Sequence, residues 1–144
     1  MADLFLVGTD GSACSKRAVT FAAERAQNAG TPLVLVAVVE WSRYAFYTPD
    51  ELETRAKAKE DEIKRAQTQV LDPLVAQLGT DDISVSSLVR HGHAAEVLST
   101  LAEEKGASQI FVGRHGQPTL GERLFGSVTS RLVQSASVPV TVVP

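Results

Sequence analysis

Three glycines and a serine that follow an apolar run are the residues of this chain with the clearest chemical potential. Gly113 and Gly116 are separated by two residues, Gly116 and Gly126 are separated by nine, and Ser127 comes directly after Gly126. Because glycine has no Cβ, such a loop can adopt positive φ and bring backbone N–H groups close to an anion. Gly126 and Ser127 then open a predicted helix, whose first turn has free N–H donors and the positive end of a dipole. Two donor clusters at this spacing predict a polyphosphate site.

The alternative is a purely structural role, in which the glycines shape a surface loop and Ser127 caps its own helix. Three glycines and a serine between a strand and a helix favour anion binding over that alternative. The motif is not a Walker A loop, because no Gly-Lys-Ser/Thr follows it. It is not a dinucleotide fingerprint either, since that fingerprint follows the first strand of its fold.

These residues must be positioned by elements that alternate between strand and helix. The apolar runs without regular alternation are typical of parallel strands that are buried on both faces. The expected strands are 4–9, 31–40, 83–90, 109–113 and 138–143, and the expected helices are 12–30, 50–79, 94–106 and 127–135. Pro73 should kink or divide the long second helix, whose charge-rich first half is expected to face solvent. The pattern predicts an α/β domain over 1–144, with a parallel sheet and helices on both faces.

Composition and charge exclude several classes of function. Of the 144 residues 44% are hydrophobic and 22% are charged, and the net charge at pH 7 is −3, which argues against general nucleic-acid binding. The single cysteine, Cys14, allows no internal disulfide and argues against a cysteine-based metal site. The N-terminus does not resemble a signal peptide, and no apolar stretch reaches the length of a membrane span. These features predict a cytoplasmic protein without a transmembrane segment.

Two loops are expected at the carboxyl ends of strands, where open sheets of this kind bind ligands. They are "TDGS" after the first strand and "GRHG" after the fourth strand. If these two strands are neighbours, the loops face each other across one crevice. Asp10, which is followed by Gly-Ser, would cap the first helix or shape the turn. His91 and His93 lack a nearby third ligand, so a metal site there is not expected.

The chain resembles the universal stress proteins, and in particular their ATP-binding branch. The resemblance rests on the pattern G-x2-G-x9-G-[S/T] at 113–127, followed by a helix and a final strand "VPVTVV". It extends to the stretches "LVGTDGS", "AVVE", "RHGHAAEVL" and "ASQIFVG", and so covers essentially the whole chain. It implies a Rossmann-like, five-stranded parallel open sheet in the order 3-2-1-4-5, with helices on both faces.

The resemblance also implies a site for ATP, accompanied by Mg²⁺. The residues that it assigns to nucleotide binding are Thr9, Asp10, Val38, Val112, Gly113, Arg114, His115, Gly116, Gly126, Ser127 and Val128. Asp10 and the backbone of Val38 would lie along the adenosine half, and Gly126 to Val128 would hold the distal phosphates. Arg114 stands where the family usually has a small polar residue. Its side chain could contact a phosphate or point to solvent.

The expected function is that of a nucleotide-sensing regulator in the stress response. Phosphoryl transfer needs a base, metal ligands and a cationic clamp, whereas only Asp10, Glu40 and Arg114 are expected near this site. No catalytic residue and no protein metal site is assigned. The alternatives are a slow ATPase or nucleotidyl-transfer enzyme on a similar fold, and a nucleotide-free dimeric scaffold.

A homodimer is expected through the final strand, 138–143. Its valines are apolar on both faces, and an apolar strand at the edge of a sheet is usually paired or blocked. Antiparallel pairing with a second copy about a two-fold axis would satisfy its free backbone groups. The aromatic loop 41–47 is expected to cover the long helix, to close over the adenine or to dock a regulatory protein partner.

Overall fold

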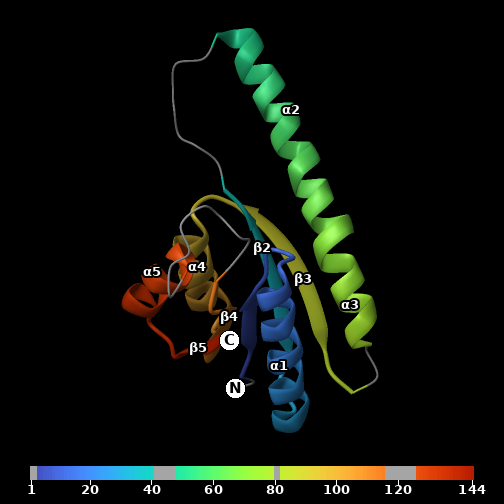
Figure 1. Cartoon of the computed structure of the whole chain (residues 1–144), viewed down its shortest axis with the longest axis vertical. Coiled ribbons are helices and arrows are strands. Elements are labelled where there is room, and N and C mark those ends of the chain that lie inside the picture. The colour runs from blue at the N-terminus through green and yellow to red at the C-terminus, as the bar shows by residue number, and fades with distance from the viewer. Residues whose placement is uncertain (1–2, 41–47, 80–81, 116–125) are drawn as a thin grey trace.

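The computed structural model describes residues 3–40, 48–79, 82–115 and 126–144. Its centre is a five-stranded, all-parallel sheet in the order β3-β2-β1-β4-β5 (Figure 1), which confirms the expected order. The strands are β1 (Phe5–Gly8), β2 (Leu33–Val39), β3 (Val85–His91), β4 (Gln109–Gly113) and β5 (Val140–Val143). The helices are α1 (Ala13–Ala29), α2 (Pro49–Arg65), α3 (Asp72–Leu78), α4 (Ala94–Lys105) and α5 (Ser127–Ser135), with a π-helical turn η1 (Ala66–Leu71) between α2 and α3.

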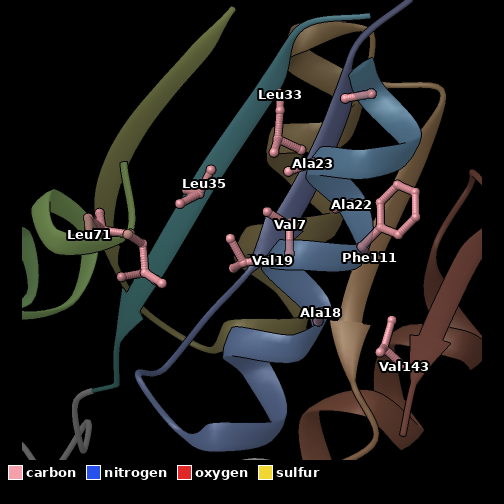
Figure 2. Packing of buried hydrophobic residues seen from close by; sticks show 13 residues of the cluster. Val7, Ala18, Val19, Ala22, Ala23, Leu33, Leu35, Leu71, Phe111 and Val143 are labelled. Atoms are coloured by element: carbon pink, nitrogen blue, oxygen red, sulfur yellow. The ribbon is translucent and has the colours of Figure 1, made fainter. Parts of the chain in front are cut away.

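The helices cover both faces of the sheet. One face packs against α1, η1 and α3, around the buried side chains of Val7, Leu35 and Phe111. Figure 2 shows these side chains around α1, which presents small alanines to the sheet. The ring of Phe111 also lies 5.3 Å from that of Phe5 and 6.1 Å from that of Phe21, measured between centroids. The opposite face packs against α4 and α5, so the central strands are buried on both sides.

Successive residues of the central strands alternate between these two faces. Leu6 and Ile110 lie in the cluster under α4 and α5, whereas Val7 and Phe111 lie in the cluster under α1. This alternation explains why the strands read as continuous apolar runs, because neither face is left to solvent.

The long second helix is interrupted as the proline predicts, but by a π-helical turn. Pro73 has no N–H to give to the preceding turn, and its ring crowds that turn. The N–H of Asp72 bonds to the carbonyl of Gln67, five residues back, so the chain widens just before the proline. The first half, α2, has no buried residue and is held by a capping box between Thr48 and Glu51. None of the described helices combines the length and apolarity that crossing a bilayer requires.

The edge strands differ slightly from the expected bounds. β3 begins at Val85 rather than at residue 83, and β5 begins at Val140 rather than at residue 138. Pro139 has no N–H for the ladder, although its carbonyl accepts a bond from Ile110 N–H at 3.0 Å. Regular pairing therefore starts one residue later.

The first turn of α1 lies directly against the end of β4. A Cβ placed on Gly113 would lie 2.9 Å from Cys14 Sγ and 3.1 Å and 3.2 Å from the backbone carbon and oxygen of Cys14. Gly113 is not among the described glycines with positive φ, so it does not use the left-handed conformation that glycine permits. Glycine is needed here because a side chain would push α1 away from the sheet.

We expect Gly113→Ala to lower the free energy of unfolding by about 1–3 kcal/mol, the usual cost of overpacking a tight contact. Urea unfolding followed by circular dichroism measures it. Cys14→Ala in the same chain should recover part of the loss, because it removes the Sγ contact and leaves the two backbone contacts. Stability equal to that of the wild type in Gly113→Ala would contradict this account of the glycine.

Candidate functional site

The loops that follow β1 and β4 lie side by side at the carboxyl edge of the sheet. The two strands pair in parallel from Phe5 with Gln109 to Val7 with Phe111, which confirms that they are neighbours. The chain winds from β1 to β2 and β3 on one side and returns to β4 and β5 on the other. The winding therefore reverses between β1 and β4, the position where open sheets bind ligands.

The loop after β1 is held by a hydroxyl network of its own. Ser15 Oγ donates to the carbonyl of Ser12 at 3.0 Å, so the hydroxyl of Thr9 is the donor in its 2.9 Å bond to Ser15 Oγ. The Ser12 hydroxyl accepts from Ser15 N–H at 3.2 Å and is the N-cap of α1. All three hydroxyls are buried and used within the loop, so the side chain of Thr9 is not available to a ligand.

The backbone donors of this loop are also satisfied internally. Thr9 N–H donates to the carbonyl of Val36, and Asp10 N–H donates to Ser15 Oγ. Gly11, whose φ is +82°, donates its N–H to Thr9 Oγ1. Ser12 N–H donates to the carboxylate of Asp10 at 2.9 Å. The turn from Thr9 to Ser12 is therefore not an anion cradle, and the exposed Asp10 carboxylate shapes it.

The start of α5 has the opposite character. Gly126 is the N-cap, in extended backbone, and no side chain caps the helix. Ser127 is thus the first helical residue and not the cap, and it is exposed. The N–H groups of Ser127, Val128 and Thr129 have no acceptor among the residues that the structure describes. The first turn of α5 has no acidic residue, so the helix itself supplies no countercharge to the positive end of its dipole.

Two hydrogen bonds fix the start of α5 to the end of β4. Thr129 Oγ1, which is buried, donates to the carbonyl of Gly113 at 2.8 Å. Gly126 N–H donates to the carbonyl of Arg114 at 2.9 Å. The open donors of α5 are therefore held at the switch point of the sheet.

Arg114 is anchored by its backbone and exposed at its side chain. Its N–H donates to the carbonyl of Val143 at 2.7 Å, and its carbonyl accepts from Gly126. Along β4, Val112 faces α4 and α5 and Gly113 faces α1. Continued alternation would turn Arg114 back to the side where α5 begins. His115 is exposed as well.

The side chains of the three valines assigned to the site pack into the core and are not displayed at the loops. Val112 is buried, and Val38 and Val128 are half-buried, all in the cluster beneath α4 and α5. Gly116 and the aromatic loop 41–47 lie outside the described residues. Within the described part of the chain, no group of three or more His, Cys, Asp or Glu side chains could hold a metal ion.

Glu40 has a contact that the sequence reasoning missed. It follows β2, and its carboxylate accepts a hydrogen bond from Ala94 N–H, at the start of α4, at 3.1 Å. The N-cap of that helix, His93, makes no capping bond of its own. Two features of the sequence could have indicated this contact, although they lie far apart. One is an acidic residue at the end of a strand, and the other is a helix that begins without a capping side chain.

Comparison with known proteins places the chain in a family. The model of the universal stress protein family matches residues 1–144. A universal stress protein of Mycolicibacterium smegmatis is 34% identical over 143 residues, which cover 96% of this chain and 47% of that protein. The chain thus spans about half the length of the mycobacterial relatives that it matches.

Solved structures agree with this placement. The universal stress protein UspA from Lactobacillus plantarum has a TM-score of 0.77 at 25% identity and covers 99% of this chain and 97% of that one. A universal stress protein in complex with cAMP has a TM-score of 0.63 at 25% identity, with the same coverage. Because the family model covers every residue and the strand order is the one that the resemblance implied, the chain belongs to the universal stress protein family.

Proposed function

We propose that this chain binds ATP with Mg²⁺ at the carboxyl edge between β1 and β4 and acts as a nucleotide-sensing regulator. The observation that carries the proposal is the first turn of α5, where three N–H groups have no acceptor among the described residues. Such a turn binds phosphate oxygens through its N–H groups and its dipole. Arg114, whose carbonyl accepts Gly126 N–H, has an exposed side chain that would add a positive charge there.

The adenosine half would extend across β1 toward the end of β2. The backbone of Val38 and the turn at Asp10 border that path, and the phosphates would then reach Ser127 and Val128. The relative of 25% identity whose structure holds cAMP, an adenine nucleotide, supports a nucleotide of this class. We favour ATP because the glycine pattern provides for more than one phosphate.

A regulatory role follows from how Asp10 is used. Its carboxylate accepts the N–H of Ser12 and shapes the turn, so the candidate base of the site already has a structural task. Bound ATP would then be held without efficient hydrolysis, and the protein would report nucleotide levels to a partner.

We further propose a homodimer through β5. Ile110 N–H bonds to the carbonyl of Pro139, and Arg114 N–H bonds to that of Val143. In a parallel ladder the bonded residues are every second one, so Thr141 also faces β4, and Val140 and Val142 present their N–H and C=O groups to the open edge. The valines are half-buried by their own chain, hence the unpaired backbone contributes more to pairing than exposed apolar area does.

Binding of ATP with Mg²⁺ should stabilise the fold by about 2.7 kcal/mol at 100 times Kd, a melting shift of roughly 5–10 °C. Gly126→Val should abolish the shift, because its side chain obstructs the phosphates while valine tolerates the extended backbone at this position. Ala136→Val is the matched control, since Ala136 is the extended C-cap of the same helix. A full shift in Gly126→Val would refute the site.

Arg114→Ala should weaken ATP binding about tenfold, the effect of losing one charge-assisted bond to phosphate. AMP binding should weaken less, because we propose that this side chain contacts the outer phosphates, which AMP lacks. Arg131→Ala, which removes an exposed arginine one turn into α5, is the control. Isothermal titration calorimetry measures both ligands. Equal losses for ATP and AMP would place the arginine elsewhere.

Static light scattering at micromolar concentration should give about twice the 15.4 kDa chain mass. Val140→Lys should shift the protein toward the monomer, because it places a charge in the half-buried row of side chains that borders the open edge. Gln134→Lys adds the same charge on the exposed side of α5 and should remain dimeric. A monomeric wild type, or a fully dimeric Val140→Lys, would rule out this interface.

A further inference from the structure

The helices that follow strands differ in the charge at their starts. The Asp10 carboxylate accepts the N–H of Ser12 at the start of α1, and α2 opens with two acidic residues, one of them in its capping box. At α4, Glu40 bonds to the first helical N–H, and Glu96 adds a second carboxylate in the first turn. Within the described residues, α5 alone has neither a capping side chain nor an acidic first turn, and Arg114 lies beside it.

The carboxylate of Glu40 is brought to α4 by the register of β2 and β3. Val39 pairs with His91, and Gly92 N–H donates to the carbonyl of Val39 at 3.0 Å. The chain then turns sharply at Gly92, whose φ is +137°, and enters α4. Glu40, the next residue after β2, therefore stands at the start of a helix that begins 54 positions later in the chain.

This contact matters because α4 begins on the side of the sheet where the adenosine half is proposed to bind. Val38, on that path, lies two residues before Glu40. Apart from its bond to Glu40, the first turn of α4 has donors in the N–H groups of Ala95 and Glu96, for which no acceptor occurs among the described residues. Without a countercharge, such a turn attracts phosphate as the start of α5 does.

We infer that Glu40 is a positioning residue, whose carboxylate closes the start of α4 to phosphate and so directs the polyphosphate to α5. The inference rests on the proposed function. The Glu40 carboxylate occupies the position at the start of α4 that a bound anion would otherwise take. The negative charges of Glu40 and Glu96 repel phosphate, and the bond to Ala94 removes one donor. The nucleotide is thereby oriented with its phosphates toward β4 and away from β3.

Inorganic phosphate is the probe that tests this, with the backbone amides followed by two-dimensional NMR on the full chain. In the wild type, phosphate should shift the amides of Ser127 to Thr129 and leave those of Ala94 to Glu96 unchanged. In the double variant Glu40→Ala/Glu96→Ala, the same phosphate concentrations should shift both sets. Glu96→Ala alone is the matched control and should behave as the wild type, because Glu40 still occupies the start of α4. Unchanged strand amides verify that each variant is folded.

The inference is overturned if phosphate does not shift the Ala94 to Glu96 amides in the folded double variant. It is also overturned if phosphate shifts these amides in the wild type or in Glu96→Ala as strongly as in the double variant. A change in stability alone would not move these amides with phosphate, so a purely structural cap gives the first of these results. If phosphate does not shift the Ser127 to Thr129 amides in the wild type, the proposed ATP site is overturned instead. The two amide sets therefore separate the two failures.

Discussion

The first N–H groups of a helix have no partner within that helix, and the way this chain meets that requirement organises its carboxyl edge. At α1 a serine caps the helix, and a hydroxyl network occupies the donors of the turn before it. At α4 the carboxylate comes from the end of another strand. At α5 none of the described residues supplies a side-chain oxygen. The N–H groups without an acceptor among the described residues, and not the glycine pattern alone, therefore distinguish the α5 end of this edge from the α1 and α4 ends.

Close packing keeps those donors in place. Gly113 lets the first turn of α1 approach the end of β4 to a distance that a Cβ would not allow. Its carbonyl also receives the hydroxyl of Thr129, while the neighbouring carbonyl receives Gly126 N–H. The helix that presents the donors and the helix that covers the opposite face thus meet at one residue of the sheet.

Much of the fold could be predicted from local patterns. Continuous apolar runs marked the strands, and Pro73 marked the break in the long helix, because both effects act within a few residues of the chain. The strand order came from the family resemblance, since the sequence pattern alone does not say which strands are neighbours.

The candidate site was harder to predict because its decisive contacts join distant residues. The need for glycine at 113 arises from Cys14, nearly a hundred positions away, and the cap of α4 comes from Glu40. The hydroxyl of Thr9, a residue that the resemblance assigned to nucleotide binding, is used together with those of Ser12 and Ser15 within one turn. Such long-range contacts and hydrogen-bond directions become visible only once the chain is folded.

The exposed helix α2 has a consequence for how the molecule opens. It has no buried side chain, and its outer end stands away from the sheet in Figure 1, so it gains little free energy from packing. Most helical stability in proteins comes from such packing, and its capping box supplies only part of what is missing. Its amides can therefore exchange with solvent through local fraying while the central strands stay closed. The chain thus carries a separate, weakly coupled unfolding unit beside a cooperative core.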